Sequence, residues 1–356
     1  MSADKPFLRI DDRKIGENFP PYIIAEMSAN HNGSLDNAKQ IIRAAKKCGA
    51  DAIKLQTYTA DTLTLDIDHE DFIIKGGLWD GKRLYQLYQE AQMPWDWHDE
   101  LFKLAKEEKI TIFSSPFDKS AVDLLEDLDV PAYKIASFES VDIPLIKYVA
   151  QTGKPMIIST GMIDEFEISD AVEAAISAGC KELALLHCVS SYPAKPEDYN
   201  LKTIKDIGRR FNCVVGLSDH TLSNTTAISS ISLGASIIEK HFTLDRSNGG
   251  PDDSFSLEPN DLLELCKETN VAWNAIGRVD YGLKSGEIGN DKFKRSLYFV
   301  RAKKAGDKIT TECIRSIRPG YGIEPKYTDF VVGNRVIEDV EYGSPVLEKL
   351  LEKKIK

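Results

Sequence analysis

The sequence predicts an α/β fold: a (β/α)8 TIM barrel of parallel strands, followed by a small β-rich C-terminal domain. Three observations support this prediction. Short apolar segments rich in Ile, Val, Leu and Tyr recur between residues 22 and 242, as expected of strands buried on both faces. Helical patterns separate most of them, and such alternation produces a parallel sheet. The segments number eight, which favours a closed barrel over an open doubly wound sheet.

The elements follow one another in a regular order. A helical pattern at 34–50 follows the first strand segment, with Ser34 as a predicted N-cap and Gly49 as its stop. The pattern at 167–180 repeats this design and ends at Gly179. The strand segments are YIIAEMS (22–28), AIKLQTY (52–58), TIFSSP (111–116), AYKIAS (132–137), MIISTG (156–161), LALLHCV (183–189), VVGLSD (214–219) and SIIEKHF (236–242). Neither G-x-G-x-x-G nor a P-loop motif follows any of them, so nucleotide-binding folds lack motif support.

The interval between the second and third strands, residues 59–110, is longer than one helix requires. It holds two helical patterns and a loop with Gly76, Gly77, Trp79 and Gly81. Long insertions in compact domains are either surface excursions or functional loops. The Trp and Gly content favours a lid over the barrel.

A helix at 258–277 and a polar, Gly-containing segment follow the eighth strand. The remainder has short β-rich runs broken by turns. We therefore predict a barrel domain at 1–280, a linker at 281–295 and a second domain at 296–356, about the smallest size that folds alone.

The composition excludes several classes of protein. The net charge is -11, whereas nucleic-acid binding needs clustered Lys and Arg, so we expect no nucleic-acid partner. No segment reaches the ~20 apolar residues of a membrane span, and the N-terminus does not resemble a signal peptide. The six cysteines are scattered without a C-x-x-C pair, which predicts a cytoplasmic protein and argues against structural zinc.

Polar side chains concentrate at the predicted C-terminal strand ends, where barrels of this kind carry their active sites. Lys54 and Lys134 lie in otherwise apolar strands, where an unpaired ammonium would be costly. They form either structural ion pairs or an anion site. In an anion site they would neutralise phosphate and carboxylate groups while hydroxyls donate hydrogen bonds, from Ser115, Ser137, Ser159 and Ser218.

His220 and His241 end the seventh and eighth strands. A single such histidine is more often a satisfied core residue, but two on neighbouring strand tips predict a metal site. With water and substrate completing the ligands, the site would be open and catalytic. It would suit Mn²⁺ or Mg²⁺ better than closed structural zinc.

Eight motifs, in this order, resemble the sialic acid synthase family. They are AEMSANHNGS, KLQTY, FSSPFD, YKIAS, STGM, GLSDHT, IEKHFTLD and GPDDSFSL. The segments RSLYFVRAKKAGDKIT and RPGYGI resemble that family's C-terminal antifreeze-like (SAF) domain, so the resemblance covers the whole chain. The stretch GGLWDGKRLYQLYQEAQMPWDWH is most similar to the branch of the family that makes pseudaminic acid.

The resemblance implies condensation of phosphoenolpyruvate with the open-chain aldehyde of an N-acetylated amino sugar, here a 2,4-diacetamido-2,4,6-trideoxy hexose. Water and a divalent metal ion take part, and a nine-carbon 2-keto acid and phosphate result. Neuraminic or legionaminic acid synthesis is the alternative within the family. The family's dimers also imply a domain-swapped homodimer, in which Arg318 of one chain reaches the sugar pocket of the other.

Residue roles carry over by position. Phosphoenolpyruvate would be held by Lys54, Ser115, Lys134, Ser137, Ser159, Ser190 and Ser218. The sugar pocket would be lined by Glu26, Gln56, Tyr192, Asp252, Ser256 and Arg318. His220 and His241 would bind the metal, and Glu139 is the candidate for proton transfer. Ser190, in HCVSSYP, replaces the Asn that many neuraminate synthases carry, which puts the contacts of that position in doubt.

Three alternative functions remain at this point. A Schiff-base aldolase would also use a barrel lysine. A phosphoenolpyruvate aldol synthase could act on phosphorylated sugars, although the antifreeze-like tail argues against it. A carbohydrate- or ice-binding protein would use the barrel only as a scaffold, and would then give Lys54 and His220 no role.

Overall fold

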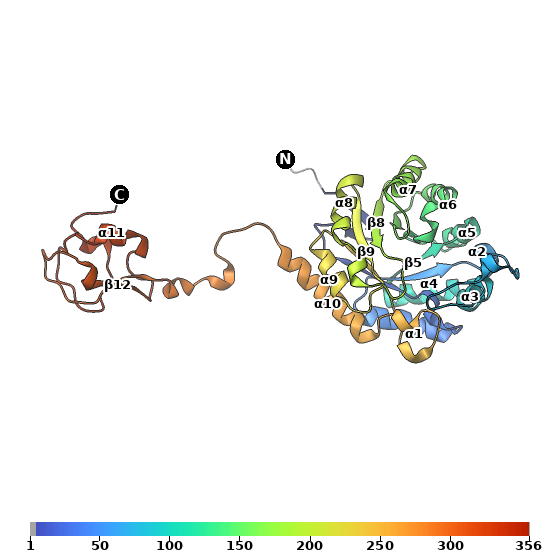
Figure 1. The fold of residues 1–356 in the computed structure, drawn as a ribbon, viewed down its shortest axis with the longest axis horizontal. Coiled ribbons are helices and arrows are strands. Elements are labelled where there is room, and N and C mark those ends of the chain that lie inside the picture. Colours follow the sequence, from blue (N-terminus) through green and yellow to red (C-terminus); the bar gives the residue numbers. More distant parts are fainter. Residues whose placement is uncertain (1–4, 356) are drawn as a thin grey trace. The chain divides into compact units, whose positions relative to one another are not determined.

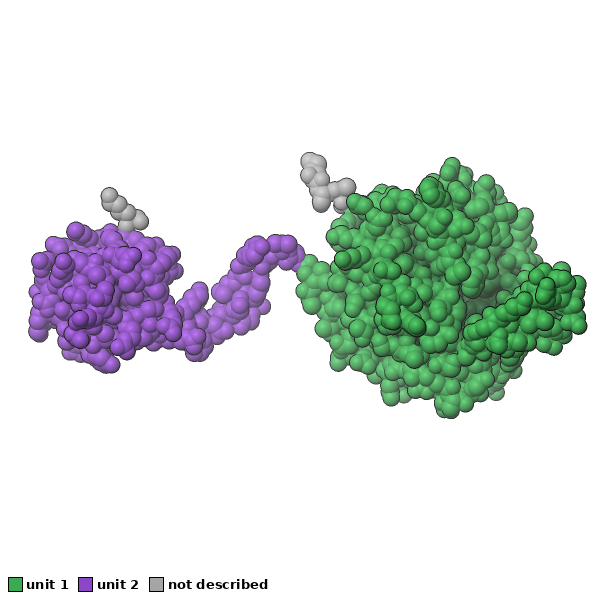
Figure 2. All heavy atoms as spheres, in the orientation of Figure 1, with its two compact units in different colours: residues 1–277 green, residues 278–356 purple. Residues whose placement is uncertain are grey.

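The computed structural model describes residues 5–355, and the chain divides between Gly277 and Arg278 into two compact units (Figure 2). In the first unit, parallel strands close into a barrel surrounded by helices (Figure 1). This confirms the predicted fold class. The barrel strands are β3 (Tyr22–Glu26), β4 (Ala52–Thr57), β5 (Thr111–Pro116), β6 (Tyr133–Ile135), β7 (Met156–Ser159), β8 (Leu183–Cys188), β9 (Val214–Ser218) and β10 (Ile237–His241).

The helices around the barrel begin and end largely as their caps dictate. In α1, the Ser34 hydroxyl accepts a hydrogen bond from the Asn37 amide, and Gly49 adopts a φ of 91° at the C-terminal end. The α-helices of this unit are α1 (Leu35–Cys48), α2 (Ala60–Leu63), α3 (Leu84–Ala91), α4 (His98–Glu108), α5 (Lys119–Asp127), α6 (Ile143–Ala150), α7 (Glu165–Ser177), α8 (Lys202–Phe211), α9 (Thr225–Ile231) and α10 (Pro259–Ile276). Short 3-10 turns join them at η1 (Ser28–His31), η2 (Glu70–Phe72), η3 (Trp95–Trp97), η4 (Phe138–Val141), η5 (Pro196–Asp198), η6 (Arg246–Asn248) and η7 (Asp253–Phe255).

An antiparallel hairpin that the sequence analysis did not predict precedes the barrel. It consists of β1 (Leu8–Ile10) and β2 (Arg13–Ile15). Leu8, Ile10 and Ile15 are fully buried and pack against the apolar residues inside the barrel. The hairpin therefore closes the end of the barrel where the strands begin.

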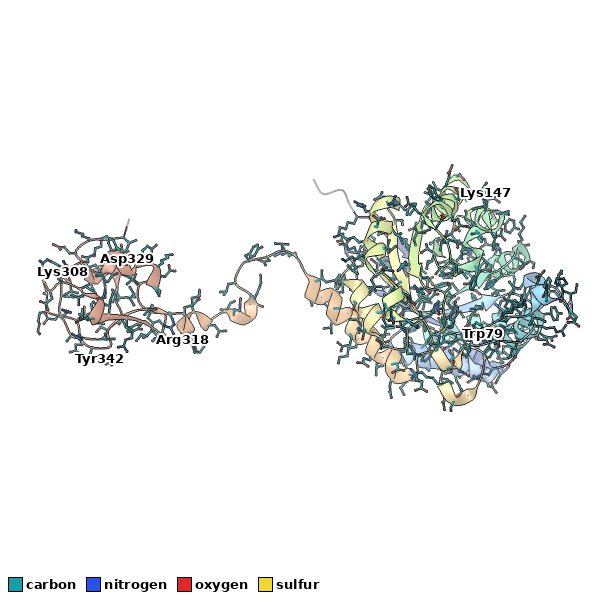
Figure 3. The ribbon with its side chains drawn as sticks, in the orientation of Figure 1. Trp79, Lys147, Lys308, Arg318, Asp329 and Tyr342 are labelled. Carbon is teal, nitrogen blue, oxygen red and sulfur yellow. The ribbon has the colours of Figure 1, made fainter. Side chains whose placement is uncertain are left out.

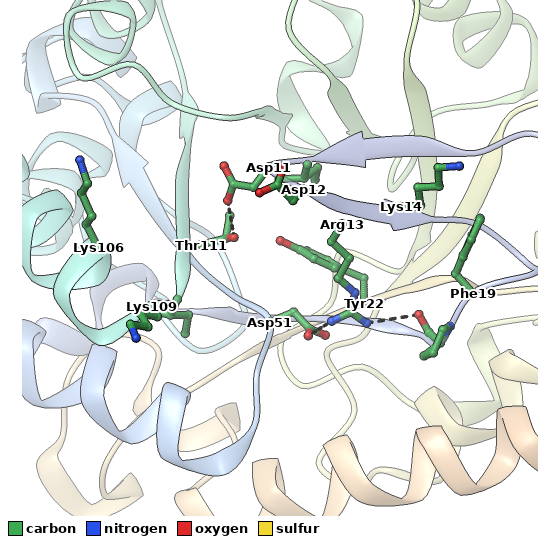
Figure 4. A pocket seen from close by; sticks show the side chains of 13 residues that line it. Asp11, Asp12, Arg13, Lys14, Phe19, Tyr22, Asp51, Lys106, Lys109 and Thr111 are labelled. Carbon is green, nitrogen blue, oxygen red and sulfur yellow. Dashed lines mark hydrogen bonds and ion pairs between the residues drawn. The ribbon is translucent and has the colours of Figure 1, made fainter.

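A cavity of about 820 Å³ lies beside this hairpin (Figure 4). Its polar groups largely bond to one another. Arg13 pairs with Asp51 and stacks on the Tyr22 ring at 5.1 Å, while the Thr111 hydroxyl donates to Asp11 at 2.6 Å. We interpret these contacts as the attachment of the hairpin to the barrel.

The inside of the barrel changes from apolar to polar along the strands. Successive side chains of a strand point to opposite faces, so every second residue points inward. The inward residues nearest the hairpin are apolar: Tyr22, Ile24, Ala52, Phe113, Ala132, Ile157, Ala184, Leu186, Val214 and Ile237. Two residues further along most strands the inward position is polar: Glu26, Lys54, Ser115, Lys134, Ser159, Ser218 and Glu239. A buried polar layer thus lies at the C-terminal ends of the strands.

The second unit is small and has its own core. Strands β11 (Ser296–Phe299) and β12 (Ile314–Ile317) pair antiparallel, and α11 (Thr328–Val331) packs in the same apolar cluster. Its 3-10 turns are η8 (Ser285–Glu287), η9 (Asn290–Phe293), η10 (Thr311–Cys313), η11 (Pro325–Tyr327) and η12 (Glu348–Leu350). Across residues 5–355, none of the helices is both long enough and apolar enough to cross a membrane.

Candidate active site

Two lysines and two glutamates form the centre of the polar layer. Lys54 Nζ lies 2.6 Å from Glu26 Oε2 and 3.8 Å from Glu239 Oε1, and Lys134 Nζ lies 4.0 Å from the same Glu239 oxygen. All four side chains are less than 10% exposed. Such buried charges persist only when they are paired and hydrogen-bonded. The two interpretations of the lysines are therefore compatible, because both are ion-paired in a layer rich in hydroxyl groups.

Serine hydroxyls supply the remaining contacts of the lysines. Lys54 Nζ donates to Ser115 Oγ at 3.2 Å, and Lys134 Nζ donates to Ser159 Oγ at 2.6 Å. The Ser218 hydroxyl donates to Glu239 Oε1 at 3.4 Å. The structure thus brings three of the four strand-end serines into direct contact with the charged centre.

Glu239 is the central residue that the sequence analysis did not place in the site. Although burial opposes its charge, Lys134 and Lys54 hold the pKa of Glu239 below its ordinary value. Burial alone would lower the pKa of Lys54, but the carboxylates of Glu239 and Glu26 hold this pKa above its ordinary value. The signal was present in the sequence, because Glu239 lies two residues before His241 and so faces the same side of its strand.

Ser137 and Ser190 meet at Gly161, beside this centre. The Gly161 amide donates to Ser137 Oγ at 3.2 Å. A Cβ at position 161 would collide with the hydroxyls of both serines, so only glycine allows this close approach. Ser190 Oγ also lies 3.8 Å from Cys188 Sγ. These contacts place Ser190 next to Ser137, another predicted anion ligand, although a serine here replaces the Asn of many neuraminate synthases.

The rings of His220 and His241 lie next to each other, with centroids 5.4 Å apart. The Val189 carbonyl lies 2.8 Å from His220 Nδ1, so Nδ1 carries a proton, and Nε2 has a free lone pair when the ring is neutral. His241 Nδ1 is buried without a hydrogen-bond partner. Burial holds the pKa of His241 well below its ordinary value. Burial also opposes the charge of His220, but Cys188 and the Val189 carbonyl hold the pKa of His220 above its ordinary value.

This pair fits a metal ligand set once His220 has lost its second ring proton, a loss that metal binding favours. Metal-binding imidazole must be neutral and must have a nitrogen free to donate its lone pair. Among residues 5–355, no cluster of three or more His, Cys, Asp or Glu side chains is arranged to hold a metal ion. The described residues therefore offer two imidazoles here, and water and substrate would have to complete the ligand set.

An aromatic cluster extends outward from the histidines. The centroid of the Tyr192 ring lies 4.3 Å from that of His220 and 5.1 Å from that of Phe255. The ring centroids of Phe255 and His241 are 5.0 Å apart. Trp79, from the insertion, lies 5.8 Å from Tyr192. The insertion therefore reaches the mouth of the barrel.

Three of the predicted sugar-pocket residues form one hydrogen-bonded chain. Gln56 Nε2 donates to Glu26 Oε1 and to Ser28 Oγ, both at 2.9 Å, and the Ser28 hydroxyl donates to Asp252. Asp252 Oδ2 lies 3.9 Å from His241 Nδ1. Asp252, Gln56 and Glu26 therefore line one side of the histidine pair.

Ser256 and Arg318 are placed differently. The Ser256 hydroxyl is fully buried, donates to the Asp252 carbonyl at 2.7 Å and accepts from Asn30 at 2.8 Å. These contacts position the loop that carries Asp252. Arg318 is exposed in the second unit, in an Arg-Pro-Gly segment (Figure 3).

Glu139 lies in η4, just after β6. Its Oε2 atom is buried without a hydrogen-bond partner. Burial raises the pKa of Glu139 to about 7, against the smaller opposing effect of Lys134. The carboxyl group can therefore lose or gain a proton near neutral pH.

Asp219 and Lys240 lie between site residues in sequence but face away from the site. Lys240 Nζ pairs with Asp219 Oδ2 at 2.9 Å and donates to the Thr221 carbonyl at 2.7 Å. They occupy the outward positions between the inward ones of Ser218, His220, Glu239 and His241. This pair holds β9 and β10 together outside the barrel.

Comparison with known proteins places the chain among sugar acid synthases. The model of the NeuB family matches residues 41–281. A pseudaminic acid synthase of Campylobacter jejuni is 43% identical over 327 residues, which cover 92% of this chain and 95% of that protein. A pseudaminic acid synthase of Helicobacter pylori is 40% identical over 337 residues, covering 94% and 99%. The crystal structure of N-acetylneuraminic acid synthetase from Leptospira borgpetersenii, in complex with citrate, has a TM-score of 0.72 and 30% identity, covering 80% of this chain and 94% of that one.

Proposed function

The chain belongs to the NeuB family, and we propose that it is a pseudaminic acid synthase. It condenses phosphoenolpyruvate with the open-chain aldehyde of a 2,4-diacetamido-2,4,6-trideoxy hexose and water, and it releases phosphate. The observation that carries this proposal is the juxtaposition of the Lys54 and Lys134 anion site with the His220 and His241 pair. The names and the 40% and 43% identities of the two pseudaminic acid synthases support the choice of sugar.

Phosphoenolpyruvate binds in the polar layer. Lys54 and Lys134 neutralise its phosphate and carboxylate groups, and the hydroxyls donate hydrogen bonds to them. The hydroxyls are those of Ser115, Ser137, Ser159, Ser190 and Ser218. Because Glu26 and Glu239 already balance the lysines, an entering anion competes with these carboxylates. Burial raises the pKa of Glu26 to about 7, so this carboxylate can be neutralised when the anion binds.

The sugar binds beside the histidines, against Glu26, Gln56, Tyr192 and Asp252. A divalent cation such as Mn²⁺ or Mg²⁺, held by His220 and His241, would supply Lewis-acid polarisation of the aldehyde. Gln56 and Asp252 orient the sugar so that its C1 faces C3 of phosphoenolpyruvate. Ser256 acts through Asp252, whose carbonyl its hydroxyl contacts.

The bond between the two carbons forms while C2 of phosphoenolpyruvate takes up water, and the resulting tetrahedral species loses phosphate. Throughout, the lysines hold the negative charge of the phosphate and carboxylate. The water loses a proton as it adds to C2, and the aldehyde oxygen gains a proton as it becomes a hydroxyl. Glu139 accepts the first or supplies the second, since its pKa near 7 makes both protonation states available. No covalent enzyme intermediate is needed.

We also propose that the enzyme is a homodimer in which the antifreeze-like second unit of one chain covers the barrel of the other. An exposed apolar rim at the barrel mouth supports this. Phe138 is 59% exposed, Met162 75% and Leu222 54%, and each follows a barrel strand at its C-terminal end.

The six buried and unpaired cysteines support a reducing, cytoplasmic location.

Phosphate release from phosphoenolpyruvate tests the function directly. We expect release with the 2,4-diacetamido-2,4,6-trideoxy hexose that leads to pseudaminic acid, and at least a tenfold lower kcat/KM with N-acetylmannosamine or the legionaminic precursor. A clear preference for N-acetylmannosamine would refute the choice of sugar. Borohydride trapping with substrate separates this reaction from a Schiff-base aldolase, because the synthase forms no imine.

A further inference from the structure

The loop that carries Trp79 is a short hairpin within the insertion, residues 73–83, here called the Trp79 loop. Ile73 and Arg83 form a bridge, and the Ile74 amide donates to the Lys82 carbonyl at 2.9 Å. Gly76, Gly77 and Gly81 adopt positive φ angles of 81°, 75° and 80°, which explains why the turn needs glycine. Trp79 is half-buried between exposed neighbours on both sides.

Trp79 attaches this otherwise exposed loop to the barrel mouth. Its indole nitrogen donates a hydrogen bond to the Pro251 carbonyl at 3.1 Å. Pro251 immediately precedes Asp252, which lines the site. A loop from residues 73–83 is thereby joined to the loop that follows β10.

The aromatic rings lie in a definite order from the histidine pair outward. Tyr192 lies over His220 at 4.3 Å, and Trp79 lies next to Tyr192 at 5.8 Å with a tilt of 51°. In the proposed function, a sugar whose aldehyde carbon lies at the histidines and that follows these rings would extend past Tyr192 toward Trp79. Trp79 would then meet the end of the sugar that is remote from the reaction.

The chemistry that Trp79 offers at this end is apolar. Its only polar atom is already bonded to the Pro251 carbonyl, so the exposed part of the indole is carbon. A hydroxyl placed against this ring would lose water without gaining a hydrogen bond, whereas a methyl group would lose nothing.

We propose that the carbon face of Trp79 is a specificity determinant that selects a methyl over a hydroxymethyl group at C6 of the sugar. This inference rests on the proposed function and deepens it, since it assigns the choice of a 6-deoxy sugar to one residue. An apolar surface discriminates against an added hydroxyl by about a hundredfold at most. A role in holding the loop, by contrast, would affect both sugars equally.

The test uses the full chain and two sugars that differ only at C6, the 2,4-diacetamido-2,4,6-trideoxy hexose and its 6-hydroxy counterpart. The quantity measured is the ratio of their kcat/KM values by phosphate release. Trp79→Leu and Trp79→Gln both remove the indole and its bond to Pro251, but only Gln offers hydrogen bonds. We expect the ratio in Trp79→Gln to fall at least tenfold below that in Trp79→Leu. Equal ratios in these two variants would overturn the proposal.

Two further variants isolate the carbon face. Trp79→Phe loses the indole N–H but keeps an aromatic face, so its ratio should stay within about threefold of wild type. If Phe loses the preference as fully as Gln does, the bond to Pro251 is the determinant and the proposal is wrong. Leu78→Ala, at a 48% exposed neighbour, is the matched control and should change the kcat/KM of neither sugar. A wild-type enzyme that uses neither sugar would refute the proposed function itself, whereas a wild-type enzyme that uses both equally would refute only the role of Trp79.

Discussion

Lys54 and Glu26 form a buried ion pair across two adjacent strands, with Nζ and Oε2 2.6 Å apart. The two residues are direct partners in the register of β3 and β4. From the sequence we expected Lys54 to hold phosphoenolpyruvate and Glu26 to line the sugar pocket. In the proposed function their contact would couple the two subsites, because Glu26 would compete with the incoming anion for the same ammonium group.

Glu26→Gln should therefore strengthen phosphoenolpyruvate binding in a pH-dependent way. At pH 8, above the Glu26 pKa of about 7, the wild-type carboxylate is ionised and holds Lys54. Its removal should lower the dissociation constant of phosphoenolpyruvate by at least about fivefold. At pH 6 the wild-type carboxyl is mostly neutral, so the difference should nearly vanish. Calorimetric titration at both pH values measures this, and equal affinities at pH 8 would show that Lys54 does not bind the anion.

Glu139→Gln should stabilise the barrel at high pH while it abolishes most of the activity. Burial raises the folded-state pKa of Glu139 to about 7, above its unfolded value of about 4.3, so wild-type stability falls as the pH rises between these two values and levels off above pH 7. The variant should therefore match wild type near pH 4 and gain about 1–3 kcal/mol in free energy of unfolding at pH 8.

Urea titrations followed by tryptophan fluorescence check the stability of the barrel alone, since all four tryptophans precede residue 277. If the gain at pH 8 is absent, Glu139 is not ionised there in a buried site. It would then be a poor candidate for proton transfer.

The arrangement of the strand ends was largely predictable from the sequence. Strands buried on both faces appear as apolar runs, so the positions of all the barrel strands could be assigned. The alternation of inward and outward residues then separates Glu239 and His241 from Lys240, and His220 from Asp219. Applied consistently, this rule would have identified Glu239 as a site residue and Lys240 with Asp219 as an outward pair.

Other features depend on contacts between residues far apart in the chain. Strands β1 and β2 have three residues each, too few to show a period, and only their burial against the barrel interior identifies them. The raised pKa of Glu139 results from burial by surrounding elements. The contact of Trp79 with Pro251 joins positions 172 residues apart, so sequence could predict a lid but not its attachment.

Lys240→Met should destabilise the barrel strongly. It would leave the buried Asp219 carboxylate without the ammonium group that lies 2.9 Å from it. Breaking such a pair costs about 3–5 kcal/mol. The double variant Asp219→Asn/Lys240→Met removes both charges and should recover part of that loss, as urea unfolding would reveal. Equal stability of Lys240→Met and wild type would show that the pair contributes nothing to the fold.

His220→Ala and His241→Ala should each abolish metal binding and lower kcat/KM at least a hundredfold, while the barrel stays folded. The strands are held by their apolar residues and not by these rings. Calorimetric titration with Mn²⁺ gives a readout independent of turnover, and His69→Ala, at an exposed imidazole in the insertion, is the matched control. Full activity of either site variant in chelator would contradict the metal assignment.

Arg318→Ala should lower kcat/KM for the sugar without changing metal binding, if Arg318 hydrogen-bonds the N-acetyl or hydroxyl groups of the sugar in the partner chain. Arg315→Ala, also exposed in the second unit, should leave activity near wild type. Truncation after residue 285 should likewise leave a folded barrel that binds metal but turns over poorly.

The decisive experiment mixes an Arg318→Ala chain with a His220→Ala chain. Each homodimer should have low activity, because one lacks the arginine and the other lacks a metal ligand in both sites. If the second unit acts in trans, a mixed dimer joins the intact barrel of the first chain to the intact tail of the second, which makes one wild-type site. Random exchange should then restore about a quarter of wild-type activity. If the tail instead serves its own barrel, every site in every dimer carries a defect, and mixing restores no activity even when subunit exchange is verified by mass spectrometry.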